Sequence, residues 1–422
     1  MTVAVFTFSL LGAMAIGMPI AFALIICGIA LMTYLAMFDS QIIAQNVING
    51  VDSFPLMAVP FFILAGEVMN TGGLARRILN FAIALVGHFR GGLGYVAILT
   101  SCILASLSGS AVADAAALGA LLVPMMAAAG HNRASAAGLV AAGGIIAPVI
   151  PPSIGFVIFG VAANVSISKL FLAGIVPGLL LGVGLCFAWW WVVRKENPAR
   201  LPRKSIAEIW RALIDGFWAL MLPMIIIFGL RFGIFTPTEA AVVVAVYSLV
   251  VAMGVYRELR PAQLPALLVS TAQTTAVVMF LVAAALVSSW LITVAEISDQ
   301  IVALVQPFAG NKTLLTFVLM IIVVIVGTAL DMTPTILILT PIVKQAGIDP
   351  VYFGVLFIIN NAIGLITPPV GVVLNVVCGV ARVSMDDLIR GVWPFMIAQL
   401  VVLALLTLFP VLVTGPAKWF GG

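Results

Sequence analysis

Two stretches of the chain show the same order of features: a polar break inside an apolar helix, followed by a Pro-Pro pair that ends a later apolar segment. These stretches lie at 104–152 and 326–369. The pairs Pro151-Pro152 and Pro368-Pro369 are 217 residues apart in a chain of 422 residues. One half of the chain is therefore interpreted as a diverged copy of the other. Interrupted apolar segments at matching positions in two halves indicate the binding site of a secondary transporter.

Composition excludes a water-soluble domain. Hydrophobic residues make up 64% of the chain, charged residues make up 8%, and the mean hydropathy is +1.28. A soluble domain needs far more charged surface than this. Because a span needs roughly 20 apolar residues, we expect an all-α polytopic membrane protein with about ten to a dozen helices and shorter re-entrant pieces. The cations lie at the ends of apolar segments, so membrane lipid is an expected partner and nucleic acid is not.

The chain divides into a first repeat half at 1–193, a connector at 194–217 and a second repeat half at 218–422. Six of the 19 cations fall within eighteen residues, from Arg194 to Arg211. Such a basic segment is typical of the cytoplasmic side of a membrane. The apolar residues of the connector recur at helical spacing, which predicts an amphipathic helix along the inner surface.

Each half contains a predicted re-entrant hairpin and a predicted interrupted helix. In the first half the hairpin is expected at 54–86, because Gly72-Gly73 ends a run that is too short to span, and the interrupted helix at 104–124. In the second half the corresponding elements are expected at 276–308 and 326–343. Non-helical backbone at membrane depth must face protein or water, so these elements are expected to line the binding site.

The breaks in the two interrupted helices are rich in hydroxyl groups. Small and hydroxylated residues loosen the helical hydrogen-bond ladder, and freed carbonyls together with hydroxyls suit a hard monovalent cation such as Na⁺. Alternatively, small residues only let membrane helices approach closely. The presence of a matching break in the other half favours the ion site. The candidate Na⁺ ligands are Ser106, Ser108, Gly109 and Ser110 in the first half, and Gly327, Thr328 and Thr333, with Thr335 close by, in the second.

Carboxylates and proline pairs accompany the breaks. Asp114 and Asp331 lie close to them, and a carboxylate in a membrane segment is costly enough to be a functional candidate. We expect these two to support the site by capping the restarted helix. Pro151-Pro152 and Pro368-Pro369 remove backbone donors and so expose carbonyls one turn earlier. This adds four secondary ligand candidates: Gly144, Ala147, Gly364 and Thr367.

Three amides, Asn360, Asn361 and Asn375, lie within an apolar stretch of the second half. An amide in such a place either contacts substrate or forms a hydrogen bond between helices. Both interpretations stay open at this point.

Catalytic chemistry is not expected. His88 and His131 each lie beside an arginine or its near neighbour at a loop-like position, and no nucleophile motif accompanies them. The chain has no glycine-rich phosphate loop of the GxxxxGK[ST] type. We therefore expect no enzyme, and any active transport is expected to be driven by an ion gradient or by another subunit.

Several long motifs carry a family resemblance. They include ASLSGSAVADAAALGALLVP, GGIIAPVIPPS and DMTPTILILTP, and the matching segments are 59–78, 105–124, 143–153, 233–251, 331–341 and 346–376. In this order they resemble the large membrane subunit of the tripartite ATP-independent periplasmic (TRAP) transporters, the DctM family. The resemblance covers essentially the whole chain. One departure lies between Pro341 and Ala346, where the chain is shorter than the family's pattern by about one helical turn.

The resemblance implies a permease with two inverted structural repeats, re-entrant helical hairpins, and a transport domain that moves elevator-fashion against a scaffold. It further implies a Na⁺ gradient, a small four-helix membrane subunit, a soluble periplasmic binding protein and a location in the bacterial inner membrane. The implied substrate is an organic acid: a C4-dicarboxylate, sialic acid or a sugar acid, with sugar-acid branches such as diketogulonate nearest. Carried over to this chain, the implied ion sites involve Ser106, Ser108, Gly109, Ser110, Gly327, Thr328, Thr333, Gly364 and Thr367.

Two alternative functions are consistent with the same features. One is a stand-alone Na⁺/dicarboxylate symporter that needs no binding protein, because such proteins share hairpins and paired interrupted helices. Copurification of a small helical subunit argues against it. The other is a membrane scaffold that transports nothing, in which Ser108→Ala and Thr333→Ala leave uptake intact.

Overall fold

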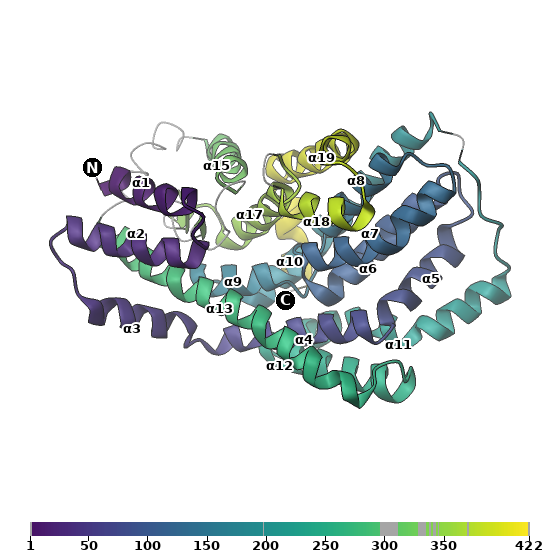
Figure 1. Ribbon diagram of the computed structural model, residues 1–422, viewed down its shortest axis with the longest axis horizontal. Coiled ribbons are helices and arrows are strands. Elements are labelled where there is room, and N and C mark those ends of the chain that lie inside the picture. The colour runs from purple at the N-terminus through teal and green to yellow at the C-terminus, as the bar shows by residue number, and fades with distance from the viewer. Residues whose placement is uncertain are drawn as a thin grey trace.

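The computed structural model describes residues 2–196, 198–295, 311–327, 335–336, 339–340, 343–344, 346–368 and 371–420. Every regular element within these ranges is helical (Figure 1). Seven helical segments in the described part are long and apolar enough to cross a membrane. The predicted all-α membrane architecture is therefore confirmed.

The first half contains the elements up to α10. These are α1 (Thr2–Ala15), α2 (Ile20–Tyr34), α3 (Ser40–Val51), the 3₁₀ turn η1 (Phe54–Met57), α4 (Ala58–Thr71), α5 (Leu74–Val86), α6 (Gly92–Ser108), α7 (Ala111–Ala128), α8 (Arg133–Gly144), α9 (Ile154–Ala163) and α10 (Ile167–Val193). Side-chain caps define several helix starts. Ser153, for example, begins α9 by accepting the N–H of Phe156 at 3.2 Å.

The second half begins with one long helix. Its elements are α11 (Ile206–Arg231), α12 (Pro237–Val250), η2 (Val251–Val255), η3 (Pro261–Gln263), α13 (Leu264–Val294), α15 (Lys312–Gly327), α17 (Pro350–Gly364), α18 (Val372–Ala381), α19 (Met385–Leu408) and α20 (Val411–Phe420). Reciprocal capping boxes start two of them, because Ser205 and Glu208 cap α11 and Thr236 and Glu239 cap α12.

Matching details identify the two halves as copies. A proline lies inside α10 at Pro177 and inside α19 at Pro394, again 217 residues apart. The residues that end α9 and α18, Asn164 and Arg382, both adopt the left-handed conformation, with φ of 53° and 51°. α8 and α17 correspond in the same way, as do α6 and α15, so the repeat predicted from the Pro-Pro spacing continues through local backbone geometry.

The two copies run in opposite directions. The start of α8 lies at the start of α19, because Arg133 Nε donates to the carbonyl of Ala381 at 3.0 Å and a side chain on Gly391 would overlap the backbone of Ala134. The start of α17 lies instead at the end of α19, where Tyr352 Oη donates to the carbonyl of Thr407 at 3.1 Å. The equivalent helices α8 and α17 thus begin at opposite ends of one helix, which is the arrangement of an inverted repeat.

The structure divides two predicted regions differently. The surface helix expected within 194–217 is the first part of α11, which continues without interruption to Arg231. The segment expected to form a hairpin at 54–86 does not fold back: α4 lies along α12, and α5 continues past Gly72-Gly73 along α11 (Figure 1). The pair that does fold back at a break is α6 and α7. Of the hairpin expected at 276–308, residues 276–294 belong to the single helix α13, and 296–310 lie outside the described residues.

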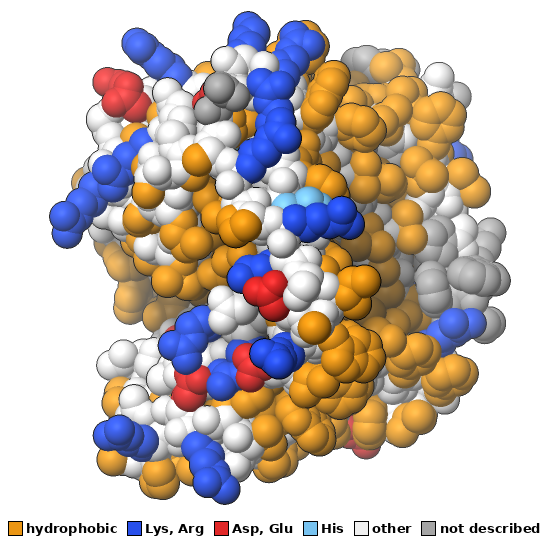
Figure 2. Space-filling view, turned by 90° about the vertical axis from the view of Figure 1, so that its right-hand side faces the viewer, with side chains coloured by type: hydrophobic (Ala, Val, Ile, Leu, Met, Phe, Trp, Pro, Cys, Tyr) orange, Lys and Arg blue, Asp and Glu red, His pale blue; other side chains and the backbone are white. Residues whose placement is uncertain are grey.

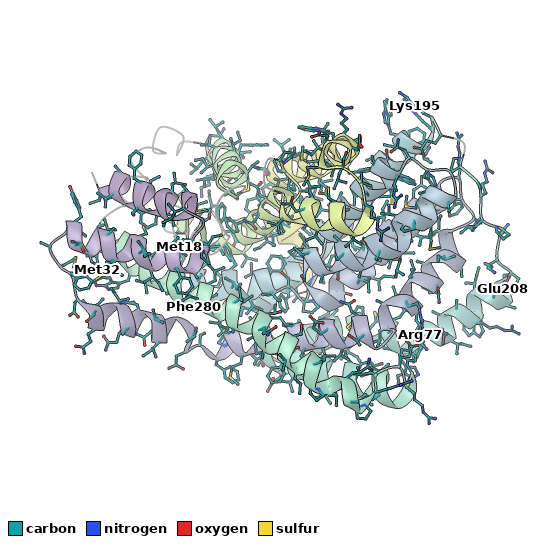
Figure 3. The ribbon with its side chains drawn as sticks, viewed as in Figure 1. Met18, Met32, Arg77, Lys195, Glu208 and Phe280 are labelled. Atoms are coloured by element: carbon teal, nitrogen blue, oxygen red, sulfur yellow. The ribbon has the colours of Figure 1, made fainter. Side chains whose placement is uncertain are left out.

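Basic side chains gather at one end of the molecule. Figure 2 shows this end, with Lys and Arg side chains spread over it and hydrophobic side chains covering the neighbouring surface. Figure 3 places Lys195, Glu208 and Arg77 at the same end. Because basic segments stay on the cytoplasmic side of a membrane, this end faces the cytoplasm.

Candidate ion and substrate site

The first predicted break is a helix end followed at once by a helix start. α6 ends at Ser108, Gly109 adopts the left-handed conformation with φ of 61°, and Ser110 begins α7. The hydroxyl of Ser110 accepts the N–H of Ala113 at 3.3 Å, which caps the new helix. The chain therefore reverses direction over two residues, at the position where the sequence places its hydroxyl cluster.

Gly109 brings the break against the first Pro-Pro segment. A Cβ added at Gly109 would lie 3.0 Å from the carbonyl oxygen of Pro152 and 3.4 Å from the backbone nitrogen of Ile154. Both its positive φ and this close approach favour glycine. The two interruptions of the first half, which are about forty residues apart in the sequence, are thus in direct contact.

The segment between α8 and α9 is held by Ser153. Its buried hydroxyl donates to the carbonyl of Pro148 and accepts the N–H of Phe156. At the other end of this segment, a Cβ on Gly144 would lie 2.9 Å from the carbonyl oxygen of Ala111, so the last turn of α8 packs on the first turn of α7. Four helix ends therefore meet here: the carboxyl ends of α6 and α8 and the amino ends of α7 and α9.

This meeting of helix ends has an electrostatic consequence. Carboxyl ends of helices present unpaired carbonyls and a partial negative charge, whereas amino ends present N–H groups and a partial positive charge. A site bordered by both kinds of end can hold a cation on one side and a carboxylate on the other. Discontinuous helices in transporters use their ends in this way.

Ser106 and Asp114 flank the break on the two helices. Ser106 is buried and its hydroxyl donates to the carbonyl of Ile103 at 2.6 Å, which leaves the lone pairs of the oxygen for another partner. Asp114 is 2% exposed and lies in the first turn of α7, where a carboxylate is favoured by the helix dipole. The side chain of Ser108 is not described.

The second break is described in part. α15 ends at Gly327, and Thr335 is buried. After α17 ends at Gly364, the hydroxyl of Thr367 donates to the carbonyl of Ile363 at 2.8 Å, and Pro368 follows. The other predicted residues of this break, Thr328, Asp331, Thr333 and Pro369, lie outside the described residues, as do 341–342 and 345 in the shortened segment.

The two halves meet around these breaks. A Cβ on Gly155, at the start of α9, would lie 3.1 Å from Cδ1 of Ile358 in α17. α7 likewise packs on α18 beside Gly119, whose Cβ would lie 3.7 Å from Val380. Each copy's short helix therefore packs on the other copy, so the first break lies at the interface of the repeats, where secondary transporters bind their substrates.

Among the three predicted amides, Asn360 connects two helices. It is fully buried, and its Nδ2 donates to the carbonyl of Met320 in α15 at 2.6 Å. Asn361 is buried in the same helix, whereas Asn375 lies on an exposed position of α18. The structure thus assigns an interhelical bond to Asn360, and the substrate role of the other two stays a prediction.

Two buried polar residues near the site were not singled out in the sequence. Gln399 of α19 is fully buried, and its Nε2 donates to the carbonyl of Ala142, in the last turn of α8. Ser101 of α6 fills the space above Gly143, where a Cβ would lie 2.6 Å from its hydroxyl oxygen. The rule that polar groups inside a membrane are costly applies to Gln399 as it does to Asn360, so this rule could have found it.

Known proteins match the chain along its whole length. A family model described as the DctM component of the tripartite ATP-independent periplasmic transporter matches residues 7–412. The chain belongs to the DctM family. This DctM protein is 55% identical, over 99% of its length and 100% of the relative's, to the 2,3-diketo-L-gulonate TRAP transporter large permease protein YiaN of Escherichia coli.

Other relatives bear the names of different substrates. The sialic acid TRAP transporter large permease protein SiaM of Vibrio cholerae is 38% identical, over 96% of this chain and 95% of that protein. The C4-dicarboxylate TRAP transporter large permease protein DctM of Pseudomonas aeruginosa is also 38% identical, over 88% of each chain. These relatives are permeases, and together with the apolar helices they place this DctM protein in the inner membrane as a multi-pass protein.

The fold is also similar to that of a solved transporter. The Alcanivorax borkumensis YdaH transporter superposes with a TM-score of 0.63 at 14% identity, over 90% of this chain and 88% of that one. At this identity the likeness concerns the fold alone.

Proposed function

We propose that this DctM protein is the permease subunit of a transporter that couples inward movement of Na⁺ to uptake of an organic acid. The observation that carries the proposal is the contact of Gly109 with the Pro152 carbonyl, which brings four helix ends to one place. Carbonyls at the ends of α6 and α8, with the hydroxyls of Ser106 and Ser110, supply oxygen ligands of the kind that Na⁺ prefers.

The amino ends of α7 and α9 support an anionic substrate. N–H groups at a helix start bind carboxylates and phosphates, aided by the helix dipole. Bound Na⁺ adds positive charge beside these groups. A carboxylate therefore binds more tightly when Na⁺ is present, and such mutual stabilisation couples the movement of the two.

We further propose a sugar acid such as 2,3-diketo-L-gulonate as the substrate. The name of the relative at 55% identity supports this choice, whereas relatives named for sialic acid and C4-dicarboxylate are at 38%. A soluble periplasmic binding protein would deliver the acid, and a small membrane subunit would complete the permease. Movement of a transport domain against a scaffold is the proposed route across the membrane.

Uptake into proteoliposomes tests the proposal. The DctM protein with the small membrane subunit is reconstituted, loaded binding protein is added outside, and labelled diketogulonate uptake is compared under an inward Na⁺ gradient and an equal K⁺ gradient. Uptake that needs Na⁺ and the binding protein supports the proposal. Uptake without the binding protein identifies a stand-alone symporter, and Na⁺-independent uptake rules out the coupling ion.

A further inference from the structure

An apolar groove opens between α5, α6 and α10, apart from the site at the breaks. It encloses about 820 Å³. Val86 of α5, Ile98 and Cys102 of α6, and Leu179 and Val183 of α10 are among its lining residues. Leu179 and Val183 are half exposed, at 52% and 49%, so the groove is open to its surroundings along α10.

Glycine makes the groove deep. A Cβ added at Gly182 would lie 2.7 Å from Sγ of Cys102, so α10 approaches α6 closely at this point. The neighbouring Cys186 also lines the groove. An apolar hollow of this kind in a membrane protein accepts hydrocarbon, because hydrocarbon chains surround the protein at this level.

The mouth of the groove is basic and aromatic. Arg90 and Arg194 line it together with Trp190, whose side chain is 56% exposed. Arg90 Nη2 donates to the backbone carbonyls of Arg194 and Glu196, at 3.1 and 2.7 Å. The guanidinium of Arg194 lies 3.4 Å from the ring centre of Trp191.

The charges of these two arginines are not neutralised within the described part of the chain. The nearest carboxylate along the chain, that of Glu196, pairs instead with Nδ1 of the buried His131 at 2.9 Å. Carbonyls and an aromatic ring orient the guanidinium groups without cancelling their charge. The mouth therefore presents two positive charges at the cytoplasmic end of an apolar groove, beside the basic segment that begins at Arg194.

We propose that this groove binds one anionic phospholipid of the cytoplasmic leaflet, with acyl chains along Leu179 and Val183 and the phosphate between Arg90 and Arg194. Charge complementarity selects this occupant, since basic pockets between membrane helices on the cytoplasmic side bind anionic headgroups. The lipid would touch both α5, which is joined to α11 by ion pairs, and α6, which ends at the ion-site break. It would therefore connect the two parts of the first half.

Native mass spectrometry of the purified full-length chain tests lipid binding directly. The probes are phosphatidylglycerol and phosphatidylcholine with identical acyl chains, titrated in detergent. A basic residue near an anionic surface contributes about 5-fold in affinity, so the double variant Arg90→Gln/Arg194→Gln should bind phosphatidylglycerol roughly 30-fold more weakly and phosphatidylcholine unchanged. The matched control is Arg200→Gln/Arg203→Gln, which removes the same charge from exposed positions outside the groove and should bind normally.

A second variant tests the apolar part without touching the arginines. Leu179→Trp fills the groove and should prevent binding of either lipid. Leu268→Trp, at a leucine of equal exposure on α13, should leave binding intact. This pair keeps the proposal testable if loss of the Arg90 hydrogen bonds impairs folding.

Three results would overturn the proposal. The first is equal affinity of the native chain for the two lipids, and the second is an equal loss of phosphatidylglycerol binding in both arginine double variants. The third is a crosslink from Leu179→Cys to an apolar helix of a copurified subunit, which would identify the groove as a protein interface. The readout is lipid binding, so it does not depend on Na⁺ coupling or on the substrate.

Discussion

Arg77 and Glu258 join two parts of the chain 181 residues apart, with Arg77 Nη1 2.6 Å from Glu258 Oε1. Arg77 begins the second turn of α5, and Glu258 lies between η2 and α13. The same guanidinium lies 3.7 Å from the ring centre of Tyr256, and its Nε is 3.4 Å from Oδ1 of Asp215 in α11. These contacts hold α5 against α11 and explain why the segment after Gly73 does not fold back on α4.

The ion pair predicts acid sensitivity. Partial burial raises the pKa of the Glu258 carboxyl, but hydrogen bonds and charge from Arg77 and Arg76 outweigh this effect and hold the pKa below its ordinary value of 4.5. A lowered folded-state pKa means that the stabilisation is present above about pH 4.5 and is lost as pH falls through the folded-state value. We expect the Tm in detergent to fall below pH 4.5 in the native chain, and to fall less steeply in Glu258→Gln. Parallel pH profiles for the two proteins would contradict this assignment.

Substitution of Gly109 should abolish uptake. Alanine in the left-handed conformation costs on the order of 1–2 kcal/mol, and its Cβ would also push against the Pro152 carbonyl. Gly130 is a matched control, because it has a φ of 91° and nothing within 4 Å of an added Cβ. We expect Gly109→Ala to lose Na⁺-dependent uptake in proteoliposomes while Gly130→Ala retains most of it. Equal activity of the two variants would show that the contact with Pro152 does not matter.

Sodium should stabilise the isolated chain. A ligand that binds only the folded state stabilises it by about 2.7 kcal/mol at a hundred times its dissociation constant. We expect a higher Tm in NaCl than in KCl or choline chloride at equal ionic strength. The increase should disappear in Ser108→Ala and in Thr333→Ala, but persist in Ser9→Ala, whose hydroxyl bonds within α1. An increase that survives both break variants would place the ion elsewhere.

Loss of Asn360 should destabilise the pairing of α15 with α17. Asn360→Ala leaves the Met320 carbonyl without its buried donor, and an unsatisfied buried group costs about 1–3 kcal/mol. Asn46→Ala removes an amide that bonds only within its own helix, to Ile42, and should cost less. Thermal unfolding of the two variants compares these effects. A similar small decrease in both would mean that Asn360 contributes little to helix pairing.

Much of the site's location could be read from short-range patterns. The hydroxyl cluster marks the end of α6 and the start of α7, because small polar residues end apolar helices and cap new ones. The Pro-Pro spacing of 217 residues identified the repeat that the capped and kinked helices display. Features such as the Gln399 amide follow the same rule, since a polar group inside a membrane segment needs a partner.

Other features depend on contacts between distant residues. The hairpin expected at 54–86 was predicted from glycines and a short apolar run, but the ions at Arg77 and Glu258 direct α5 along α11 instead. The groove beside Leu179 also needs three separate helices to form.

The sequence by itself determined a membrane protein of two related halves, with breaks rich in hydroxyls and a basic cytoplasmic segment, because hydrophobicity, helix capping and charge act over a few turns of chain. Only the tertiary structure decided that Gly109 meets Pro152, that the copies are inverted, and that Arg90 and Arg194 share one groove. The physical reason is that these arrangements depend on close packing between helices, which the order of residues along any one helix does not specify.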